Sequence, residues 1–529
     1  MVKRFKHIEL FSGCGGMTLG LENAGFELFF ANELSPMAGE TFSYNILKED
    51  LLNLSQENSS SQKTLWVNSN FESNDLKNRL RENPFESKKG KYSDLKKEID
   101  LKNKLVIGDI DELLKWLLQN PGVVKNILNE NIDLLSGGPP CQSFSLAGKR
   151  EKNNAKNLLP LSFAKFAGLI KPKIVLLENV RGITAPFTEE GVKYFAWFEV
   201  AKAFALEGFV PICMLLNSKY FGVAQNRPRF IMMALRIDIA NSIFKKRKDA
   251  VILESIRFHH LVNENKTTTQ NIEKDSLKVY DIEIFSSLFN GFLFPKIITD
   301  KNNFLSVLDV IDDIKTSVIK KIGSESTKSK SKNSPQNIAN TILPNHEARV
   351  HSYQVRARFR IYQIINELNS EYKKVAQDLI LGEKISKVEY DKLVKVFQNY
   401  DFLVESPDGI IHYRKLNGQK EFDNYFKKII TKKHSQRALR KNEPAPAQLT
   451  IPDDVCHYDK YQLRTMTVRE MARLQSFPDS FIFRSKVTTG GISRRFEVPQ
   501  YTQVGNAVPP LLAKSLGETV AYLLKMINR

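Results

Sequence analysis

Apolar runs that end in glycine or acidic residues alternate with stretches of helical periodicity over residues 5–236. Such runs predict buried strands, and their regular alternation with helices predicts parallel βαβ units. We expect strands at 5–11, 26–31, 105–110, 132–135 and 174–177, and one more after Arg229. Helical spacing is clearest over 17–24 and 158–170. The pattern predicts an α/β fold with a Rossmann-like sheet.

The most unusual turn follows the fourth of these strands and reads Gly-Gly-Pro-Pro-Cys-Gln-Ser-Phe-Ser over 137–145. The two prolines fix φ and cannot extend a strand, whereas the two glycines allow angles that other residues resist. We therefore expect Cys141 on a stiff loop at the carboxyl edge of the sheet, where open α/β sheets bind ligands. Taken alone, a free cysteine is more often a small buried hydrophobe.

Two further strand ends favour a functional role for this cysteine. The run at 174–177 leads into Glu178, and the first strand leads into the glycine-rich turn Phe-Ser-Gly-Cys-Gly-Gly over 11–16. A nucleophile, an acid and a glycine-rich turn at strand ends together indicate an enzyme site. The turn lacks the G-x-G-x-x-G spacing that holds a dinucleotide pyrophosphate, so a nucleoside without phosphates fits better than NAD. A tight turn without a ligand is the alternative.

Other polar residues at strand ends have two readings each. Glu33 suits a pair of ribose hydroxyls, or it is an acid favoured near a helix start. Asp109 suits an adenine amino group, or it is a helix N-cap. Arg227 and Arg229, with Gln225, precede a strand and form either part of the site or a solvated face.

The periodicity also divides the chain. Residues 48–103 are rich in Lys, Asn, Ser and Glu, and we expect a solvated insertion or partly disordered loop. The βα alternation stops over 237–460, where a Lys/Ser run at 320–334 resembles a linker and 353–368 and 371–400 resemble helices. We predict boundaries that give segments 1–236, 237–460 and 461–529.

The last segment carries Thr467 and Glu470 at the spacing of a capping box. A proline-started helix then runs to Leu524 and would bring Asn506 back against the first sheet. His346 and His351 lack further ligands, so we favour capping or packing there and expect no metal site.

Charge narrows the class of partner. The net charge is +19 and the pI near 9.4, and residues 411–442 hold 10 basic but only 2 acidic residues. This excess indicates a polyanionic partner, nucleic acid before membrane, although basic runs are often merely solvated. We see no apolar run near the roughly 20 residues of a membrane span and no signal-peptide core. Four scattered cysteines without a CxxC pair suit a reducing cytoplasm.

The chain resembles the DNA (cytosine-5-)-methyltransferases of bacterial restriction–modification systems through motifs in a fixed order: ELFSGCGG, NE, GDI, GGPPCQSFS, ENV, QNRPR, TVREMARLQSFP and QVGNAVPP. The resemblance spans 1–236 and 461–529, with Glu9 where the family is expected to have aspartate. It implies a class I S-adenosylmethionine-dependent methyltransferase sheet with helices on both faces. It also implies a separate mixed α+β target-recognition domain at 237–460. The expected partners are double-stranded DNA and a cognate restriction endonuclease, and the expected state is a monomer in the bacterial cytoplasm.

The resemblance further implies a reaction and its residues. Cys141 would add to carbon 6 of a flipped-out cytosine, Glu178 would hold a proton at ring nitrogen 3, and Arg229 with Arg227 would hold the carbonyl oxygen and the nucleotide. S-adenosyl-L-methionine would give its methyl group to carbon 5 and leave as S-adenosyl-L-homocysteine. The residues implied to hold it are Phe11, Gly13, Cys14, Gly16, Glu33, Asp109, Ile110, Pro140, Leu159 and Asn506.

Two other functions fit the same residues. One is methylation of cytosine carbon 5 in RNA, especially tRNA, by the same catalytic lobe. The other is a catalytically idle DNA-binding regulator that keeps S-adenosylmethionine for structure. The joint presence of Cys141, Glu178 and Arg229 argues against an idle protein, because a regulator needs none of them.

Overall fold

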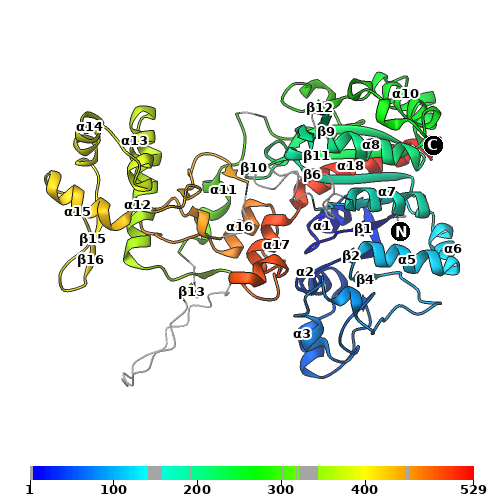
Figure 1. Ribbon diagram of the computed structural model, residues 1–529, viewed down its shortest axis with the longest axis horizontal. Helices are drawn as coiled ribbons and strands as arrows, with labels where there is room; N and C mark the ends of the chain where they lie inside the picture. The colour runs from blue at the N-terminus through cyan, green and yellow to red at the C-terminus, as the bar shows by residue number, and fades with distance from the viewer. Residues whose placement is uncertain are drawn as a thin grey trace. The chain divides into compact units, whose positions relative to one another are not determined.

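The computed structural model describes residues 4–140, 158–189, 192–300, 302–316, 319–320, 343–447, 450 and 452–528. The chain forms two compact units (Figure 1). The first unit comprises Met1–Phe304 and Gln475–Arg529, and the second comprises Leu305–Leu474.

The first unit is built on a nine-stranded sheet with the order β12-β9-β11-β6-β5-β1-β2-β4-β3. Within the described ranges β11 alone runs antiparallel to its neighbours. Its strands are β1 (Phe5–Leu10), β2 (Phe26–Glu33), β3 (Thr64–Trp66), β4 (Lys104–Ile107), β5 (Leu134–Gly137), β6 (Ile174–Val180), β9 (Phe209–Asn217), β11 (Pro228–Arg236) and β12 (Val279–Asp281). The chain order reverses at β1, which lies between β5 and β2, and such switch points are where open α/β sheets bind ligands.

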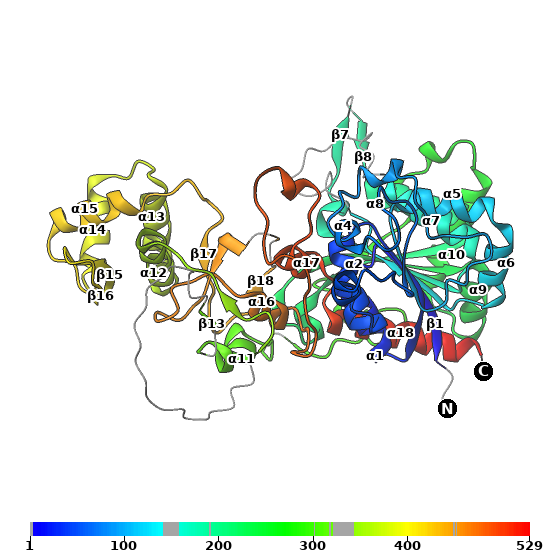
Figure 2. The same cartoon turned by 90° about the horizontal axis from the view of Figure 1, so that it is seen from below.

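Helices cover both faces of this sheet, as predicted (Figure 2). The helices of this unit are α1 (Gly16–Asn23), α2 (Pro36–Phe42), α3 (Leu51–Gln56), α4 (Leu76–Arg79), α5 (Ile110–Gln119), α6 (Pro121–Asn129), α7 (Leu159–Ile170), α8 (Ala196–Leu206), α9 (Ile237–Lys246), α10 (Ala250–Glu264), α17 (Gln500–Asn506) and α18 (Pro510–Ile527). Helices α5 to α8 pack on one face, and α1, α9 and α18 pack on the other. Short strands β7 (Phe187–Glu189) and β8 (Val192–Tyr194) form a hairpin, and β10 spans Gln225–Asn226. The central strands are buried on both faces, which explains their continuous apolar sequences.

The C-terminal helix α18 packs against α1, the first helix of the chain. Helix α18 packs along α1 so closely that a Cβ at Gly20 would lie 2.3 Å from the carbonyl oxygen of Pro510. A Cβ at Gly16 would similarly lie 2.4 Å from the carbonyl oxygen of Val508. The glycines of the first helix therefore serve helix packing as well as the turn before it.

The segment 48–103 differs from the expected solvated loop. It contributes β3 to the sheet, and Trp66 and Leu76 are buried with residues of β2 and β4 in a small core. The guanidinium of Arg79 is also buried, and its Nη1 donates to Asp94 at 2.6 Å. A few apolar anchors among many polar residues hold this segment, and its polar composition concealed them.

The boundary between the units also differs from the predicted positions 236/237 and 460/461. Strand β11 runs directly into α9, whose Ile239, Ala240 and Ile243 are buried against the sheet. Strand β12 then pairs in parallel with β9. The regular βα alternation ends near 236, but the core of the first unit continues to Phe304 because these elements still cover the sheet.

The second unit has its own core of helices and short strands. Its elements are α11 (Val307–Ile311), β13 (Ile319–Lys320), β14 (Glu347–Ala348), α12 (Tyr353–Glu367), α13 (Ser370–Leu381), α14 (Lys387–Phe397), β15 (Phe402–Glu405), β16 (Ile411–Arg414), α15 (Gln419–Ile429), β17 (Arg437–Ala438), β18 (Ala445–Pro446), β19 (Val455–Cys456) and α16 (Val468–Leu474). Phe397, Phe402, Phe422 and Phe426 pack together in its centre. The Lys/Ser run at 320–334 lies, apart from Lys320, outside the described residues.

The structure confirms the capping box of Thr467 and Glu470 and the packing role of His346 in the second unit. Glu470 Oε2 accepts from the backbone N–H of Thr467 at 2.8 Å, while the Thr467 hydroxyl accepts from the N–H of Glu470 at 3.1 Å. The imidazole of His346 lies 2.8 Å from both the Thr467 hydroxyl and the carbonyl oxygen of Ile314. The histidine therefore packs at the capped helix start.

Candidate active site

The sheet places several of the predicted site residues in one row. Leu10 pairs with Asn32 on one side and Gly137 on the other, and Gly137 pairs with Leu177. The carboxyl ends of β2, β1, β5 and β6 therefore lie at one edge, followed by the start of antiparallel β11. This edge carries Glu33, the turn after β1, the Gly-Gly-Pro-Pro segment and Glu178 in that spatial order. Cys141 lies outside the described residues, one position beyond Pro140.

Glu178 and Arg229 form an ion pair at this edge. Nε of Arg229 lies 2.7 Å from Oε1 of Glu178, and the two side chains are 11% and 10% exposed. Both residues lie on the same face of the sheet. Glu178 is two residues from Leu176 and Arg229 is two residues from Ile231, and Leu176 and Ile231 are buried in the same core. Burial lowers the pKa of Arg229, and the neighbouring carboxylate opposes this shift. The ion pair therefore fixes the orientation of the Glu178 carboxylate at a site that is largely shielded from water.

The loop that leads to Cys141 is attached to the same strand as the acid. The Asn179 side chain donates to the carbonyl oxygen of Pro139 at 3.1 Å. A Cβ at Gly138 would lie 3.0 Å from Oε2 of Glu178, so the glycine leaves room for the carboxylate to approach the backbone. The described part of the loop thus runs directly past Glu178.

The glycine-rich turn lies beside Glu33. Oε2 of Glu33 accepts from the N–H of Gly13 and Oε1 from the N–H of Ser35, both at 2.8 Å. Burial raises the pKa of Glu33 despite these bonds. Phe11 and Gly13 have positive φ values of 55° and 56°, and a Cβ at Gly13 would meet no atom within 4 Å. The turn is therefore open on one side. Because Ser35 caps α2, the contact of Glu33 with the N–H of Ser35 confirms the helix-start reading of Glu33.

The sequence analysis did not predict two features near the turn, the unpartnered hydroxyl of Ser12 and the ion pair between Lys88 and Asp109. The buried Ser12 hydroxyl has no hydrogen-bond partner among the described residues, and buried polar groups are rarely left so without a ligand or water. Asp109 caps α5 by accepting from the N–H of Asp111 at 2.9 Å, which confirms the N-cap reading. Its other oxygen lies 2.5 Å from Nζ of Lys88. Serine is common in turns, and Lys88 is far from Asp109 in sequence, so neither gave a signal.

Comparison with known proteins identifies the family. The family model of the C-5 cytosine-specific DNA methylases matches residues 5–68 and 95–521, which is most of the chain. The chain belongs to this family. It is a DNA (cytosine-5-)-methyltransferase of the bacterial restriction–modification type.

Individual relatives agree with this assignment. The type II methyltransferase M.DdeI of Desulfomicrobium norvegicum is 24% identical over 98% of this chain and 89% of its own length. M1.HphI of Haemophilus parahaemolyticus is 24% identical over 97% of this chain and 86% of its own length. Among solved structures, the S. pombe Dnmt2 methyltransferase aligns over the whole of both chains at 13% identity, with a TM-score of 0.40. The last similarity is too low to support a conclusion about function.

The remaining residues predicted to bind the cofactor differ in their burial. Ile110 is the buried first residue of α5, Leu159 is half-buried at the start of α7, and Pro140 and Asn506 are exposed. The Cys14 side chain is buried, and its Sγ lies 3.8 Å from the carbonyl oxygen of Gln503. Its thiol therefore packs against the C-terminal segment, so only its backbone faces the turn.

Arg227 also has a different place from Arg229. Its Nη2 donates to the carbonyl oxygens of Gly505 and Ala507 at 2.9 and 3.0 Å, and the side chain is fully buried. Its backbone N–H donates to Asn217 at 3.0 Å. Arg227 therefore links the residue before β11 to the C-terminal end of α17. It does not place Arg227 in a hydrogen bond with Glu178.

The three cysteines that the structure describes are small buried residues, which is what a free cysteine most often is. Burial raises the pKa of Cys14 to about 12 and also raises the pKa of Cys213 and Cys456. Such thiols are inert at neutral pH. Within the described ranges no group of three or more His, Cys, Asp or Glu side chains is arranged to hold a metal. In the same ranges no helix combines the length and apolarity of a membrane span.

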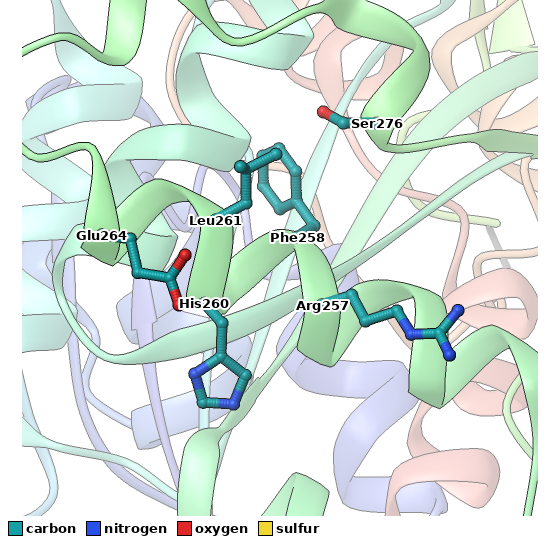
Figure 3. A pocket seen from close by; sticks show the side chains of 6 residues that line it. All are labelled: Arg257, Phe258, His260, Leu261, Glu264 and Ser276. Carbon is teal, nitrogen blue, oxygen red and sulfur yellow. The ribbon is translucent and has the colours of Figure 1, made fainter.

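A surface hollow lies apart from the row of strand ends. It is lined by Arg257, Phe258, His260, Leu261, Glu264 and Ser276, mostly from α10 (Figure 3). None of these residues belongs to a family motif, and the hollow contains no nucleophile beside a general base. The row of strand ends is therefore the candidate active site.

Proposed function

We propose that the enzyme methylates carbon 5 of a cytosine that is flipped out of a specific double-stranded DNA sequence, through a covalent adduct with Cys141. The observation that carries this proposal is the buried ion pair between Glu178 and Arg229. The loop before Cys141 is attached to β6, the strand that carries Glu178. A thiolate, a carboxylic acid and a guanidinium at one edge are the groups that nucleophilic addition to a pyrimidine requires.

The turn after β1 fits S-adenosyl-L-methionine as the methyl donor. The orphaned Ser12 hydroxyl and the open side of Gly13 mark a place for a polar ligand. Glu33 would take the ribose hydroxyls, and Asp109 with Ile110 would take the adenine. Phe11, Gly16, Leu159 and Asn506 would complete the pocket, together with the backbone of Cys14 and Pro140. When bound, the donor supplies an electrophilic methyl group, and it leaves as S-adenosyl-L-homocysteine.

The chain's own residues would activate the cytosine. The Cys141 thiolate forms a bond to carbon 6, and the electron pair of the 5,6 double bond makes carbon 5 nucleophilic. Glu178 holds a proton at nitrogen 3, so negative charge does not accumulate on the ring. Arg229 orients Glu178 and stabilises the carbonyl oxygen. After methylation a base removes the carbon 5 proton, the double bond re-forms, and the thiolate leaves.

The second unit would recognise the DNA target. A base inside a duplex must leave the stack to reach a sheet edge, and reading the flanking bases needs a separate surface. The basic segment 411–442 belongs to this unit and would contact phosphates. We further propose that the enzyme acts as a monomer and protects host DNA from a cognate restriction endonuclease. The measured mass of the DNA complex would test the monomer.

Methyl transfer from labelled S-adenosylmethionine tests the proposed substrate directly. Duplex genomic DNA should accept label in the cytosine fraction, whereas tRNA should not. Label in tRNA alone would support the RNA methyltransferase, and label in neither would support an idle regulator. Bisulfite sequencing of host DNA with and without the enzyme would then identify the recognised sequence.

A further inference from the structure

Residues 69–94 are the one internal segment that the family model leaves unmatched, yet they reach a predicted cofactor residue. This segment contains a short 3-10 turn, Ser87–Lys89. From this turn Lys88 extends its ammonium to within 2.5 Å of Oδ2 of Asp109. An element outside the family pattern therefore contacts the residue expected to bind adenine.

The segment is held firmly enough to position this lysine. Ser69 and Tyr92 form an antiparallel bridge with N–O distances of 2.7 and 3.1 Å. A Cβ at Gly90 would lie 2.1 Å from the carbonyl oxygen of Ser69, so the backbone approach requires glycine. Glu82 accepts from the Ser69 hydroxyl at 2.9 Å and from the N–H of Asn70 at 2.7 Å. These contacts hold the chain on both sides of the Ser87–Lys89 turn, and none of them uses the Lys88 side chain.

The two partners differ in exposure in an informative way. The Asp109 side chain is 8% exposed, whereas Lys88 is 42% exposed. Oδ1 of the Asp109 carboxylate already accepts the capping hydrogen bond from the N–H of Asp111 in α5, so the ammonium compensates the charge on Oδ2. A base that covered Asp109 would remove its remaining water, and a neutral amino group cannot balance a full negative charge. Each carboxylate oxygen has two lone-pair directions, so Oδ2 can accept from Lys88 and from an adenine amino group together.

We propose that Lys88 is a positioning residue for the methyl donor: its ammonium orients the Asp109 carboxylate so that this carboxylate can accept a hydrogen bond from the adenine amino group. This inference rests on the proposed function, because it concerns the same pocket. Loss of the ammonium leaves a nearly buried carboxylate to be desolvated alone, and this cost exceeds the gain from a freed lone pair. Lys88 acts at the adenine end of the ligand, which donor and product share. It therefore affects the affinity for donor and product equally and leaves the affinity for DNA unchanged.

Calorimetric binding of S-adenosyl-L-homocysteine to the full chain tests the proposal without turnover. We expect Lys88→Ala to bind about tenfold more weakly than the wild type, and Lys88→Arg to bind within about threefold of it, because arginine keeps the charge. Lys89→Ala is the matched control, since Lys89 is exposed on the same turn and has no ion pair in the described part of the chain; it should bind normally. In steady state, Lys88→Ala should raise the KM for the donor and leave the KM for DNA unchanged.

A double variant separates a local role from a general one. If Lys88 acts through Asp109, Lys88→Ala should cost little affinity once Asp109→Asn has removed the charge. Equal affinity of Lys88→Ala and wild type would overturn the inference while leaving the proposed function intact. The same holds if Lys89→Ala weakens binding as much as Lys88→Ala does. A wild-type chain that binds no S-adenosyl-L-homocysteine would overturn the proposed cofactor as well.

Discussion

Arg229 donates to Glu178 across the junction between the antiparallel strand β11 and the parallel strand β6, at 2.7 Å. Backbone pairing fixes both strands, so the carboxylate is oriented before any ligand binds. The described part of the loop before Cys141 is attached to β6 next to the acid. The catalytic proposal depends on this preorganisation.

Glu178→Gln should lower kcat by about 10²- to 10⁴-fold, because the amide cannot supply a proton to the ring. S-adenosyl-L-homocysteine should still bind with wild-type affinity, since Glu33 and Asp109 are untouched. Single-turnover methylation and calorimetry on the same preparation measure the two effects. A variant that retains more than a tenth of the activity would exclude Glu178 as the proton donor.

Arg227→Met should destabilise the enzyme by about 2–4 kcal/mol, because it leaves two buried carbonyl oxygens without donors. Denaturant unfolding measures this loss. If Arg227 instead contacts substrate, the variant would keep its stability and lose only catalytic rate.

Gly20→Ala should destabilise the first unit by about 1–3 kcal/mol, since the added methyl would lie 2.3 Å from a backbone oxygen of α18. Gly122→Ala is the matched control in α6, where a Cβ meets no atom within 4 Å. It should stabilise the protein by about 0.4–1 kcal/mol. Thermal unfolding of both variants tests the close packing of α1 on α18, which equal behaviour of the two would refute.

Glu9 should make stability fall as pH rises. Burial raises the pKa of Glu9 to about 8 from 4.5, so the folded state holds a proton that the unfolded state has lost between these values. The stabilisation is complete below about pH 4.5 and is lost as pH approaches 8, at roughly 1.4 kcal/mol per unit. Glu9→Gln should flatten this slope between pH 5.5 and 8 in thermal unfolding. Parallel slopes for the two proteins would mean that Glu9 is charged when folded.

The sequence predicted β1, β2, β4, β5, β6 and β11, because buried strands are continuous apolar runs whose ends are marked by glycine or polar residues, but it did not predict β3, β9 and β12. It offered two readings of Glu33 and of Asp109, and in each case the helix-start reading holds while the ligand role stays a prediction. Local patterns of this kind need no knowledge of distant contacts.

Features that depend on long-range packing were missed. The boundary near 236 followed the loss of βα alternation, but α9 is amphipathic and still covers the sheet. Polar composition concealed the role of Trp66 and Arg79 in the insertion. No spacing rule joins Lys88 to Asp109 or Arg227 to Gly505, because the fold alone brings these residues together.

The most direct test is covalent trapping with a duplex oligonucleotide that carries 5-fluorocytosine at the recognised position. Fluorine at carbon 5 cannot leave as a proton does, so the adduct should persist after methyl transfer. We predict a protein–DNA species that survives denaturation, maps to Cys141 by peptide mass spectrometry and is absent from Cys141→Ser, which should still bind DNA. Full turnover with no adduct, or an adduct at another residue, would contradict the account.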